Sequence, residues 1–272
     1  MSKKLIDICG SIVVYNQSYD DLKPAIDSFL NTELNVRLFL IDNSPKKLLR
    51  KKICDLRIFY KPNDHNIGFG KAHNKVIKST VGLSKYHLVL NPDVYFEKGN
   101  LEKMFNYMEL NPDVGQLMPK VLYPNNELQY VCKLLPRPSD LFLRRFLPLF
   151  SSPKYALRNF SYSRVIDIPN LSGCFMFLRA ESLKKVGLFD PVFFMYLEDV
   201  DLTRRMNAHY RTIFFPNSEI FHKHEKASFK SMKLLLIHIK SAIYYFNKYG
   251  WFQDSERKRI NKKVINNLLN NH

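Results

Sequence analysis

Acidic residues and cysteines are scarce in this 272-residue chain, and both shortages reduce the number of protein classes to which it can belong. The chain has 25 aspartates and glutamates against 42 lysines and arginines, which gives a formal net charge of +17. Such a charge predicts an anionic partner: nucleic acid, anionic lipid or a phosphorylated substrate. The cysteines form no C-x-x-C pair, so we expect buried reduced thiols and neither a disulfide framework nor a zinc site: Cys9, Cys54, Cys132 and Cys174.

Long hydrophobic runs are also missing. No apolar stretch approaches the length that spans a bilayer. The N-terminal "MSKKLIDICGSIVVYN" places lysines before apolar residues, but Asp7 interrupts the run and no small-residue cleavage site follows. This pattern predicts a first strand and not a signal peptide. We therefore expect a soluble or peripheral protein.

The remaining composition is that of a globular protein. Hydrophobic residues make up 46%, aromatic residues 14% and charged residues 25% of the chain, which excludes disordered and collagen-like classes. A chain of this length can bury one sizeable core and carry a smaller appended lobe. The sequence contains no internal repeat and no low-complexity tract.

Strands and helices are predicted to alternate over the first hundred residues. Apolar runs predict strands at 6–16, 36–44, 57–61 and 86–94, and helical spacing predicts helices at 18–31, with Ser18 as N-cap, and 70–80. This alternation indicates an α/β fold with a mainly parallel, doubly wound sheet covered on both faces. In such sheets ligands bind beyond the carboxyl ends of the strands. Polar side chains follow three of these strands: Tyr15 and Asn16, Asp42 and Asn43, and Asn91 and Asp93.

The second half of the chain is less regular. We expect a helix at 100–110 and a strand with a turn at 114–131. Residues 132–170 contain five prolines and many basic and aromatic residues, which predicts a long excursion from the sheet. Regular structure is expected again at 170–190. The final segment, 229–252, predicts one long helix in which Lys233, Lys240 and Asn247 fall on one stripe.

Three carboxylates directly follow an apolar run in "FFMYLEDVDLTRRM", residues 193–206: Glu198, Asp199 and Asp201. A helix starting near Asp199 would direct Leu202 and Met206 to a core and pair Asp201 with an arginine three or four residues later. That pattern does not explain Glu198, because a carboxylate at the end of an apolar run is costly without a partner. Two interpretations stay open: favourable charge at a helix start, or carboxylates at the wall of a polar site.

The string "LVLNPDV" is a possible cation site. Proline holds Asn91 in an extended conformation, and residues two apart in an extended segment project the same way, so Asn91 and Asp93 would point together. An amide oxygen and a carboxylate suit a divalent cation that also binds a diphosphate. The alternative is an ordinary Asn-Pro-Asp turn.

Three further strings contain groups that suit a nucleotide or a metal. "NDHNIGFGKAHN" places Lys71 and Asn74 in a helix start where a phosphate could bind, although its spacing matches neither the P-loop nor the dinucleotide fingerprint, so a plain loop stays open. "IFHKHEKAS" places His222 and His224 on one face if extended; they are either ligands or hydrogen-bonded surface groups. Asp42 in "IDNS" could accept from a base or ribose hydroxyl, or cap a turn.

The order of these strings resembles the inverting glycosyltransferases of family 2, which have the nucleotide-sugar-binding GT-A fold. The series is "VVYN", "IDNS", "NIGFGKAHN", "LVLNPDV", "SGCFMFLRAESLKKVGLFDPVFFMYLEDVDLTRR" and "FHKHEKAS". It is most similar to the bacterial rhamnosyltransferase-like branch, which builds O-antigen and other cell-envelope polysaccharides. The resemblance runs from about Ile6 to the final helix, and residues 172–205 are its most specific part.

The resemblance implies roles for individual residues. A nucleoside pocket would be lined by Tyr15, Asn16, Asp42 and Asn43. The nucleotide and its diphosphate would be bordered by Gly68, Lys71, Asn74 and Asn91. A Mg²⁺ or Mn²⁺ ion would be held by Asp93, Asn91 and His222, with His224 as the alternative histidine. Asp199 falls on the family's general base, with Glu198 beside it, and an ordinary carboxyl pKa around 4 is expected to suffice.

Two departures from the family pattern have consequences. The acidic motif usually begins with aspartate and here begins with Asn91, so one ligand charge is missing and metal affinity is expected to fall. No Gln-x-x-Arg-Trp string follows Asp201, and the membrane spans of processive members are absent. Transfer of one sugar per encounter is therefore expected.

The resemblance also implies domains and partners. Residues 1–227 would form the GT-A domain, with a nucleotide-binding half at about 1–100 and an acceptor half at about 101–227, and residues 228–272 a basic amphipathic helical extension. The donor would be a thymidine or uridine diphosphate sugar, rhamnose or another deoxysugar, and the acceptor a saccharide on a lipid diphosphate. The enzyme would lie in the cytoplasm, at the inner face of the cell membrane, where "LFLRRFLPLF" and the final helix could contact anionic lipid. The same helix could instead pack on the catalytic domain or in a homodimer.

Two other classes of function remain. A net charge of +17 with interleaved aromatic residues is typical of nucleic-acid-binding proteins, but the charge is dispersed and no known nucleic-acid-binding motif is present, so nucleic acid is not expected as a partner. The asparagine at position 91 also permits a protein that binds sugar nucleotides without turnover.

Overall fold

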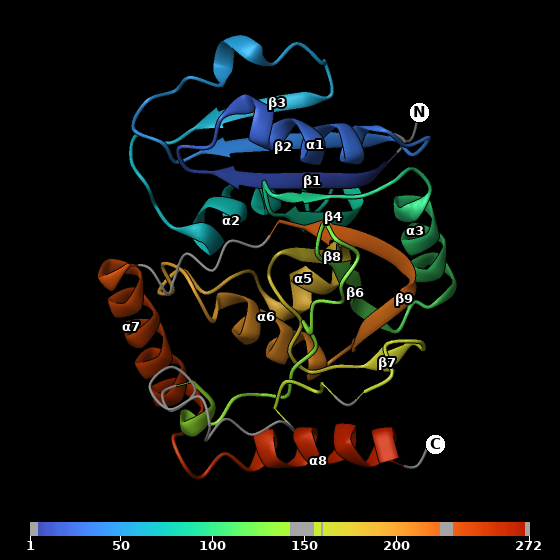
Figure 1. Cartoon of the computed structure of the whole chain (residues 1–272), viewed down its shortest axis with the longest axis vertical. Helices are drawn as coiled ribbons and strands as arrows, with labels where there is room; N and C mark the ends of the chain where they lie inside the picture. The colour runs from blue at the N-terminus through green and yellow to red at the C-terminus, as the bar shows by residue number, and fades with distance from the viewer. Residues whose placement is uncertain (1–4, 142–154, 159, 224–230, 270–272) are drawn as a thin grey trace.

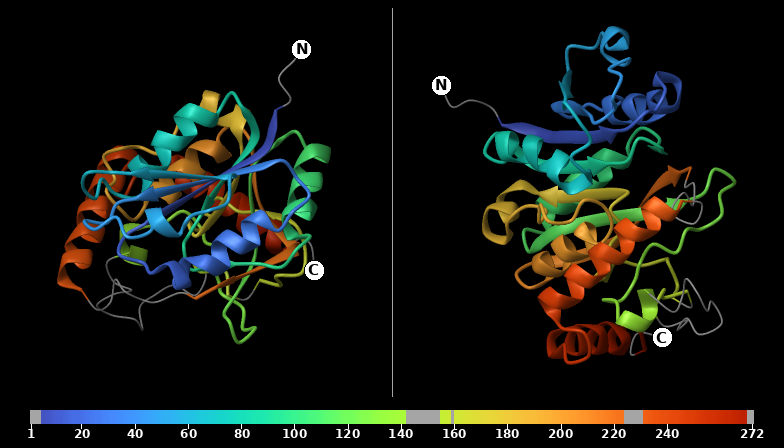
Figure 2. Two further views of the ribbon diagram at one scale, coloured as in Figure 1. Left: turned by 90° about the horizontal axis from the view of Figure 1, so that it is seen from above. Right: turned by 90° about the vertical axis from the view of Figure 1, so that its left-hand side faces the viewer.

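The computed structural model describes residues 5–141, 155–158, 160–223 and 231–269. Within these ranges nine strands form one mixed sheet in the order β3-β2-β1-β4-β8-β6-β9-β5, with β7 paired to β9. Helices cover the sheet on both faces (Figures 1 and 2). The predicted α/β class is confirmed.

The first half of the chain forms the parallel part of the sheet. Its strands are β1 (Ile6–Val14), β2 (Val36–Asp42), β3 (Ile58–Pro62) and β4 (Ser84–Leu90). Its helices are α1 (Tyr19–Leu30), the short 3-10 turn η1 (Arg50–Lys52) and α2 (Phe69–Thr80). The Ser18 side chain accepts a hydrogen bond from the Asp21 amide, so the predicted N-cap is confirmed.

The second half adds antiparallel strands. Its elements are β5 (Val94–Tyr95), α3 (Asn100–Leu110), β6 (Val114–Leu122), β7 (Ile166–Asp167), β8 (Phe175–Arg179), α5 (Ala180–Val186), α6 (Glu198–Asn207) and β9 (Arg211–His222). Strand β8 lies antiparallel between β4 and β6, whereas β6 and β9 are parallel. The excursion predicted at 132–170 contains β7 and leaves most of "LFLRRFLPLF" (142–150) outside the described residues.

The C-terminal part forms two helices where one was predicted. Helix α7 spans Met232–Tyr249 and α8 spans Ser255–Leu269. Gly250 ends α7 with φ 101°, a left-handed conformation that glycine adopts without a steric penalty. Figure 2 shows α7 lying across α6. No helix in the described part of the chain has the length and apolar character needed to cross a membrane.

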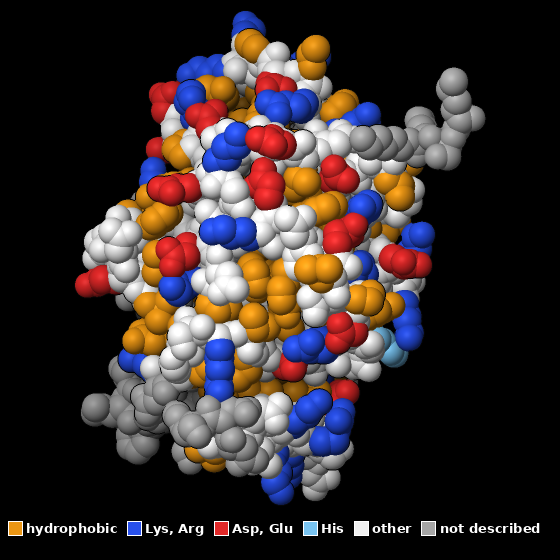
Figure 3. All heavy atoms as spheres, turned by 90° about the vertical axis from the view of Figure 1, so that its right-hand side faces the viewer, with side chains coloured by type: hydrophobic (Ala, Val, Ile, Leu, Met, Phe, Trp, Pro, Cys, Tyr) orange, Lys and Arg blue, Asp and Glu red, His pale blue; other side chains and the backbone are white. Residues whose placement is uncertain are grey.

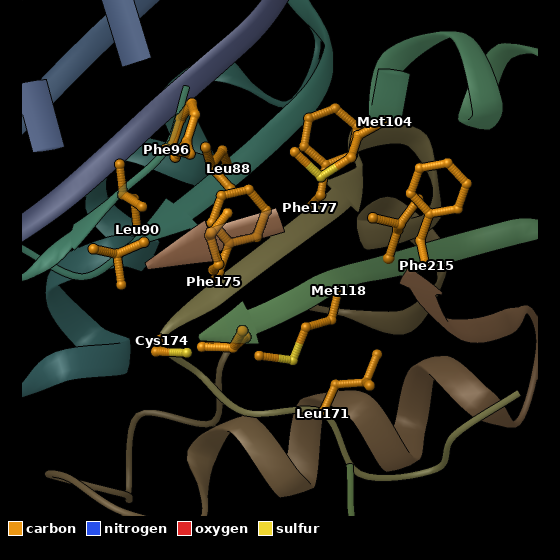
Figure 4. Packing of buried hydrophobic residues seen from close by; sticks show 14 of the residues in the cluster. Leu88, Leu90, Phe96, Met104, Met118, Leu171, Cys174, Phe175, Phe177 and Phe215 are labelled. Carbon is orange, nitrogen blue, oxygen red and sulfur yellow. The ribbon is translucent and has the colours of Figure 1, made fainter. Parts of the chain in front are cut away.

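Side chains of alternating direction along the strands build a core on each side of the sheet. Leu88 and Leu90 pack with the α1 and α3 side, whereas Val89 packs with α2, α5 and α6. Figure 4 shows part of the first cluster, with Phe175 and Phe177 of β8 pointing into it. Burial of such large apolar side chains is the main favourable contribution to folding.

Two predictions about reactive or charged side chains are tested by the fold. Cys9, Cys132 and Cys174 are buried, Cys54 is exposed, and all four are free thiols. The upper and middle parts of the face shown in Figure 3 mix acidic and basic side chains, so the positive charge is dispersed there.

Candidate active site

The carboxyl ends of the parallel strands meet at one edge of the sheet. Val14 pairs with Asp42, Asp42 with Pro62, and Ile12 with Leu90. The polar residues that follow β1, β2 and β4 therefore share one edge, as the alternating pattern predicts. Tyr15 is 46% exposed there.

Asp42 and Asn43 form a buried polar wall at this edge. Asp42 is fully buried and accepts hydrogen bonds from the Tyr60 hydroxyl and from the Ser44 amide, the latter at 2.8 Å. Asn43 is 2% exposed; its side-chain oxygen accepts from Asn63 at 2.8 Å. These bonds fix both side chains, and both carboxylate oxygens of Asp42 are engaged by the protein itself, so its predicted contact with a nucleoside stays a prediction.

Asn16 is held in the same wall by its backbone. Its φ is 62°, a left-handed conformation that asparagine tolerates better than most residues. Its amide donates to the Ser44 hydroxyl at 2.8 Å, which joins the end of β1 to the end of β2. The position therefore demands asparagine or glycine for a backbone reason.

The start of α2 is tied to the loop before α6. Gly68 has φ 89°, and a Cβ there would lie 2.3 Å from the Phe194 carbonyl oxygen, so only glycine fits. The Phe69 amide donates to that carbonyl at 2.9 Å. This amide is therefore occupied, whereas Lys71 at the same helix start is exposed, so its ammonium is open to a phosphate.

Asn74 joins α2 to the same loop further along. Its side-chain amide donates to the Phe189 carbonyl at 2.7 Å, and its oxygen accepts from the Phe189 amide at 3.1 Å. Both functional groups of Asn74 are thus engaged with backbone. Asn74 therefore fixes the loop at Phe189, and its side chain points toward this loop.

Asp93 and His222 lie side by side. Val94 of β5 pairs with His222 of β9, and the Asp93 carboxylate lies 3.3 Å from Nε2 of His222. The other ring nitrogen, Nδ1, lies 3.2 Å from the Gln129 side-chain oxygen, which orients the ring. His224 lies outside the described residues.

The charge state of His222 follows from these neighbours. Burial lowers its pKa, but Cys174 and Asp93 outweigh burial and raise the pKa to about 10. The Asp93 side chain is 37% exposed and that of His222 7% exposed, so the carboxylate is open to solvent. The pair offers a carboxylate oxygen, and it offers an imidazole nitrogen only when a cation displaces the proton that a pKa of about 10 keeps on His222.

Asn91 connects this pair to the acidic pair at α6. The backbone N–H of Asn91 donates to the Cys174 carbonyl at 2.9 Å. The backbone N–H of Gly173, the residue before Cys174, donates to Asp199 Oδ2 at 2.7 Å. The segment 172–174 therefore spans the two sets of carboxylates. A Cβ at Gly173 would lie 3.1 Å from the Cβ of Asp199, so any larger residue would push the carboxylate away.

Glu198 and Asp199 occupy the first turn of α6. Asp199 Oδ1 also accepts from the Val200 amide at 2.8 Å, so both of its oxygens accept backbone N–H groups. Glu198 is 5% exposed, and its Oε2 has no hydrogen-bond partner in the part of the chain that the structure describes. All three carboxylates lie in the first turn of α6, and Asp201 is bound to Arg205 within the helix, whereas a polar site at Glu198 and Asp199 stays a prediction.

Both acidic side chains have raised pKa values, which corrects the expectation of an ordinary carboxyl. Burial, followed by the charge of Asp199, raises the pKa of Glu198 well above its usual value. Burial also raises the pKa of Asp199, while the Gly173 amide and Lys133 oppose the increase. Because the charge of each carboxylate disfavours ionisation of the other, the two carboxyls lose their protons as a pair, with the larger increase in pKa at Glu198.

The apolar run before Glu198 is less buried than predicted. Phe193 and Leu197 are 1% and 5% exposed, but Val192 and Phe194 are 61% and 38% exposed. The predicted core positions Leu202 and Met206 are both fully buried, which confirms the helix. The run is therefore a loop with alternate residues anchored in the core.

Sequence reasoning missed several contributors to the site: Gln129, Lys133, Gly173 and Cys174. Gly173 carried a signal, because a glycine beside a buried strand often marks close backbone approach. Gln129 and Lys133 carried none, since they lie in segments without regular period and reach the site through tertiary contacts.

Whether a divalent cation suits the site depends on its donors. Asp93, which directly precedes β5, supplies a carboxylate, and His222 of β9 supplies an imidazole that binds a cation in its neutral form. No group of three or more histidine, cysteine or acidic side chains arranged for a metal occurs among the described residues. Two protein ligands suffice for an ion that takes its other ligands from substrate phosphates and water, so the donor set fits Mg²⁺ or Mn²⁺.

Comparison with known proteins agrees with this geometry. Residues 11–187 match the model of Glycosyl transferase family 2. The chain is 24% identical over 246 residues to N-acetylglucosaminyl-diphospho-decaprenol L-rhamnosyltransferase of Mycobacterium tuberculosis, covering 82% of this chain and 79% of that protein. It is 26% identical over 247 residues to rhamnosyltransferase WbbL of Escherichia coli K12, covering 86% and 91%.

A solved structure extends the likeness to the fold. The crystal structure of GalNAc-T7 with UDP, GalNAc and Mn²⁺ superposes with a TM-score of 0.61 at 14% identity, covering 80% of this chain and 43% of that one. At this identity the likeness concerns the GT-A fold. Because the family model matches more than half of the sequence, the chain belongs to family 2 of the glycosyltransferases and is a glycosyltransferase with the GT-A fold.

Proposed function

We propose that this glycosyltransferase transfers one sugar per encounter, rhamnose or another deoxysugar, from a nucleoside diphosphate to a saccharide carried on a lipid diphosphate. The configuration of the anomeric carbon is inverted in the transfer. The observation that carries the proposal is the segment 172–174, which ties the Asn91–Asp93 turn to the Asp199 carboxylate. The names of the two rhamnosyltransferase relatives support the sugar, and that of the mycobacterial one supports the acceptor. Thymidine and uridine diphosphate donors both suit the site.

Asp199 is the proposed general base. The acceptor hydroxyl oxygen forms a bond to the anomeric carbon while the bond from that carbon to the diphosphate oxygen breaks, and the hydroxyl proton passes to Asp199. Two backbone N–H groups orient the carboxylate. Its raised pKa favours proton transfer, because a base is most effective when its pKa approaches the working pH.

Asp93 and His222 are the residues proposed to hold Mg²⁺ or Mn²⁺, with Asn91 beside them. A bound ion would offset negative charge on the leaving diphosphate. Lys71 at the start of α2 is proposed to add a second positive charge on the same group. Asp42 and Asn43 shape the nucleoside pocket, and Tyr15 and Asn16 close it at the end of β1.

The acceptor's lipid diphosphate places the proposed reaction at an anionic membrane surface. Helix α7 exposes Met232 and Leu236, at 71% and 54%, next to Lys233 and Lys240. Apolar side chains flanked by lysines favour the boundary between headgroups and acyl chains. We accordingly propose that the extension 228–272 packs on the catalytic domain and also contacts the membrane surface.

A binding experiment tests the proposal. Thermal stabilisation of the purified protein is measured with a panel of nucleoside diphosphate sugars, with and without Mg²⁺ or Mn²⁺. The expected result is a metal-dependent increase in melting temperature with one donor, absent in Asp93→Ala. No stabilisation by any donor with either metal would refute the proposal and favour nucleic acid as the partner.

A further inference from the structure

Helix α7 contacts the loop that leads into Glu198 and Asp199. The Ser241 hydroxyl donates to the Met195 carbonyl at 2.8 Å. The Tyr196 ring lies 5.2 Å from that of His238, and the Phe193 ring 4.9 Å from that of Tyr244, both edge to face. Three residues of the loop before α6 thus contact α7: Phe193, Met195 and Tyr196.

The same loop carries backbone strain at its last two residues. Tyr196 and Leu197 have φ of 72° and 67°, a region that residues with a Cβ rarely adopt. Two such residues in succession persist only when the surroundings hold them. Leu197 is 5% exposed and packs in the cluster that contains Ala242 and Tyr245 of α7.

The end of α7 and the turn after it hold the other side of the acidic pair. Asp201, fully buried, accepts from the Lys248 ammonium and from the Tyr249 hydroxyl, each at 2.7 Å. Arg204, 3% exposed, donates to both oxygens of Asp254 at 2.7 and 2.8 Å. These are buried charge-assisted hydrogen bonds, and the arginine pair is bidentate, which fixes orientation.

We propose that α7 and the turn after it act as a clamp that positions Asp199 for its reaction, with Lys248, Tyr249 and Ser241 as positioning residues. The inference rests on the proposed role of Asp199 as base. Contacts on both sides of Glu198 and Asp199 fix the first turn of α6 against the Gly173 amide. The clamp lies beyond the residues that match the family model, which end at 187.

The clamp is tested by removing the donors to Asp201. The double variant Lys248→Met with Tyr249→Phe keeps both side-chain volumes and removes both bonds. We expect its kcat for transfer to fall about 10²-fold, the loss that a displacement of about 1 Å causes at a reacting group. The KM for the nucleotide sugar should change less than kcat, because within the described residues Lys248 and Tyr249 bind Asp190 and Asp201 and no side chain of the donor half of the sheet. Lys248→Arg alone should retain most of the kcat.

A matched control separates positioning from general stability. Val264 of α8 is 5% exposed and packs in the main core, away from the loop before α6. Val264→Ala should lower the melting temperature while leaving kcat near the wild-type value. A double variant with wild-type kcat, or a Val264→Ala variant with an equal loss of kcat, would overturn the clamp. Absence of transfer by the wild-type protein with every donor would instead refute the proposed function itself.

Discussion

The two sets of acidic residues at the site are built in opposite ways. Asp199 stands in the first turn of α6 with both oxygens bound by backbone N–H groups and a buried carboxyl, Glu198, beside it. Asp93 is 37% exposed and has His222 as its close neighbour. The proposed acceptor side is thus fixed by bonds within the protein, whereas the carboxylate on the proposed diphosphate side is more exposed to solvent.

This difference has a physical reason. A base must be oriented before reaction, because orientation supplies much of the rate of a bimolecular step. A cation site that is shared with a substrate must open at every turnover, so it keeps few protein ligands. We therefore expect substitutions on the acceptor side to change the rate and those on the diphosphate side to change donor affinity.

The largest effect is expected from Asp199→Asn. The amide keeps the shape and can still accept the Gly173 N–H, but it cannot take a proton. Loss of a general base lowers the rate by about 10²–10⁴-fold, so kcat should fall to that extent while the donor Kd stays within about twofold. Single-turnover assays and calorimetry would measure the two quantities. A variant that keeps more than a tenth of the wild-type rate would contradict the role of Asp199.

Asp93→Ala should change the proposed diphosphate side of the site. A charged contact of about 1.5–3 kcal/mol is lost, which corresponds to about 10–100-fold weaker donor binding in the presence of Mn²⁺. Without metal the wild type and the variant should bind equally. The matched control is Glu97→Ala, which removes an exposed carboxylate four residues away. Equal weakening in the control would show that the effect is unspecific.

Asn91→Asp should strengthen the diphosphate side. The change adds the carboxylate that the family motif usually has and leaves the backbone bond to Cys174 intact. Mn²⁺ affinity is expected to rise about tenfold, that is by about 1.4 kcal/mol. Asn31→Asp, at the opposite edge of the sheet after α1, adds the same charge elsewhere and should have no such effect. Titration of donor binding with metal would measure both variants.

Glu198→Gln should have the smallest effect on the rate. Burial raises the pKa of Glu198 and so favours its protonated form, which glutamine copies, and kcat should stay within about threefold of wild type. Stability gives the sharper readout. A carboxyl with a raised folded pKa binds its proton more tightly in the native state, so wild-type stability falls as pH rises above its unfolded pKa.

The difference between the two proteins should therefore grow with pH, by about 1.4 kcal/mol per pH unit until Glu198 ionises in the native state. Urea unfolding at a series of pH values from 5 to 8, a range of about three units, would measure it. Parallel stability curves for wild type and variant would show that Glu198 is ionised in the folded protein.

The sequence predicted the parallel half of the fold well. Each strand from β1 to β4 is an apolar run bounded by turn residues, and Ser18 marks the start of α1 by local hydrogen bonding. Such signals are local, so they survive without knowledge of tertiary contacts. The mixed direction of β8 was not predicted, because strand direction depends on how long connections return to the sheet.

The site was predictable where its residues follow strands and unpredictable where distant segments meet. Asp93 and His222 are more than a hundred residues apart, and the motif order, not spacing, brought them together in the prediction. The buried state of Glu198 was suspected from the apolar run. The raised pKa of Asp199 was not predicted, because it depends on burial in the folded protein, which the Gly173 amide and the Lys133 charge only partly offset. Residues 228–272 were predicted as a helical extension, but its division into α7 and α8 after Gly250 was not predicted.

The stereochemistry of the product tests the central claim most directly. If Asp199 removes the acceptor proton while the diphosphate leaves from the opposite face, the new glycosidic bond has the inverted anomeric configuration relative to the donor. The one-bond coupling between the anomeric carbon and its hydrogen, measured by NMR on the purified product, reports that configuration. Inversion is the result we predict. Retention would require a different route and would contradict the role of Asp199 as base.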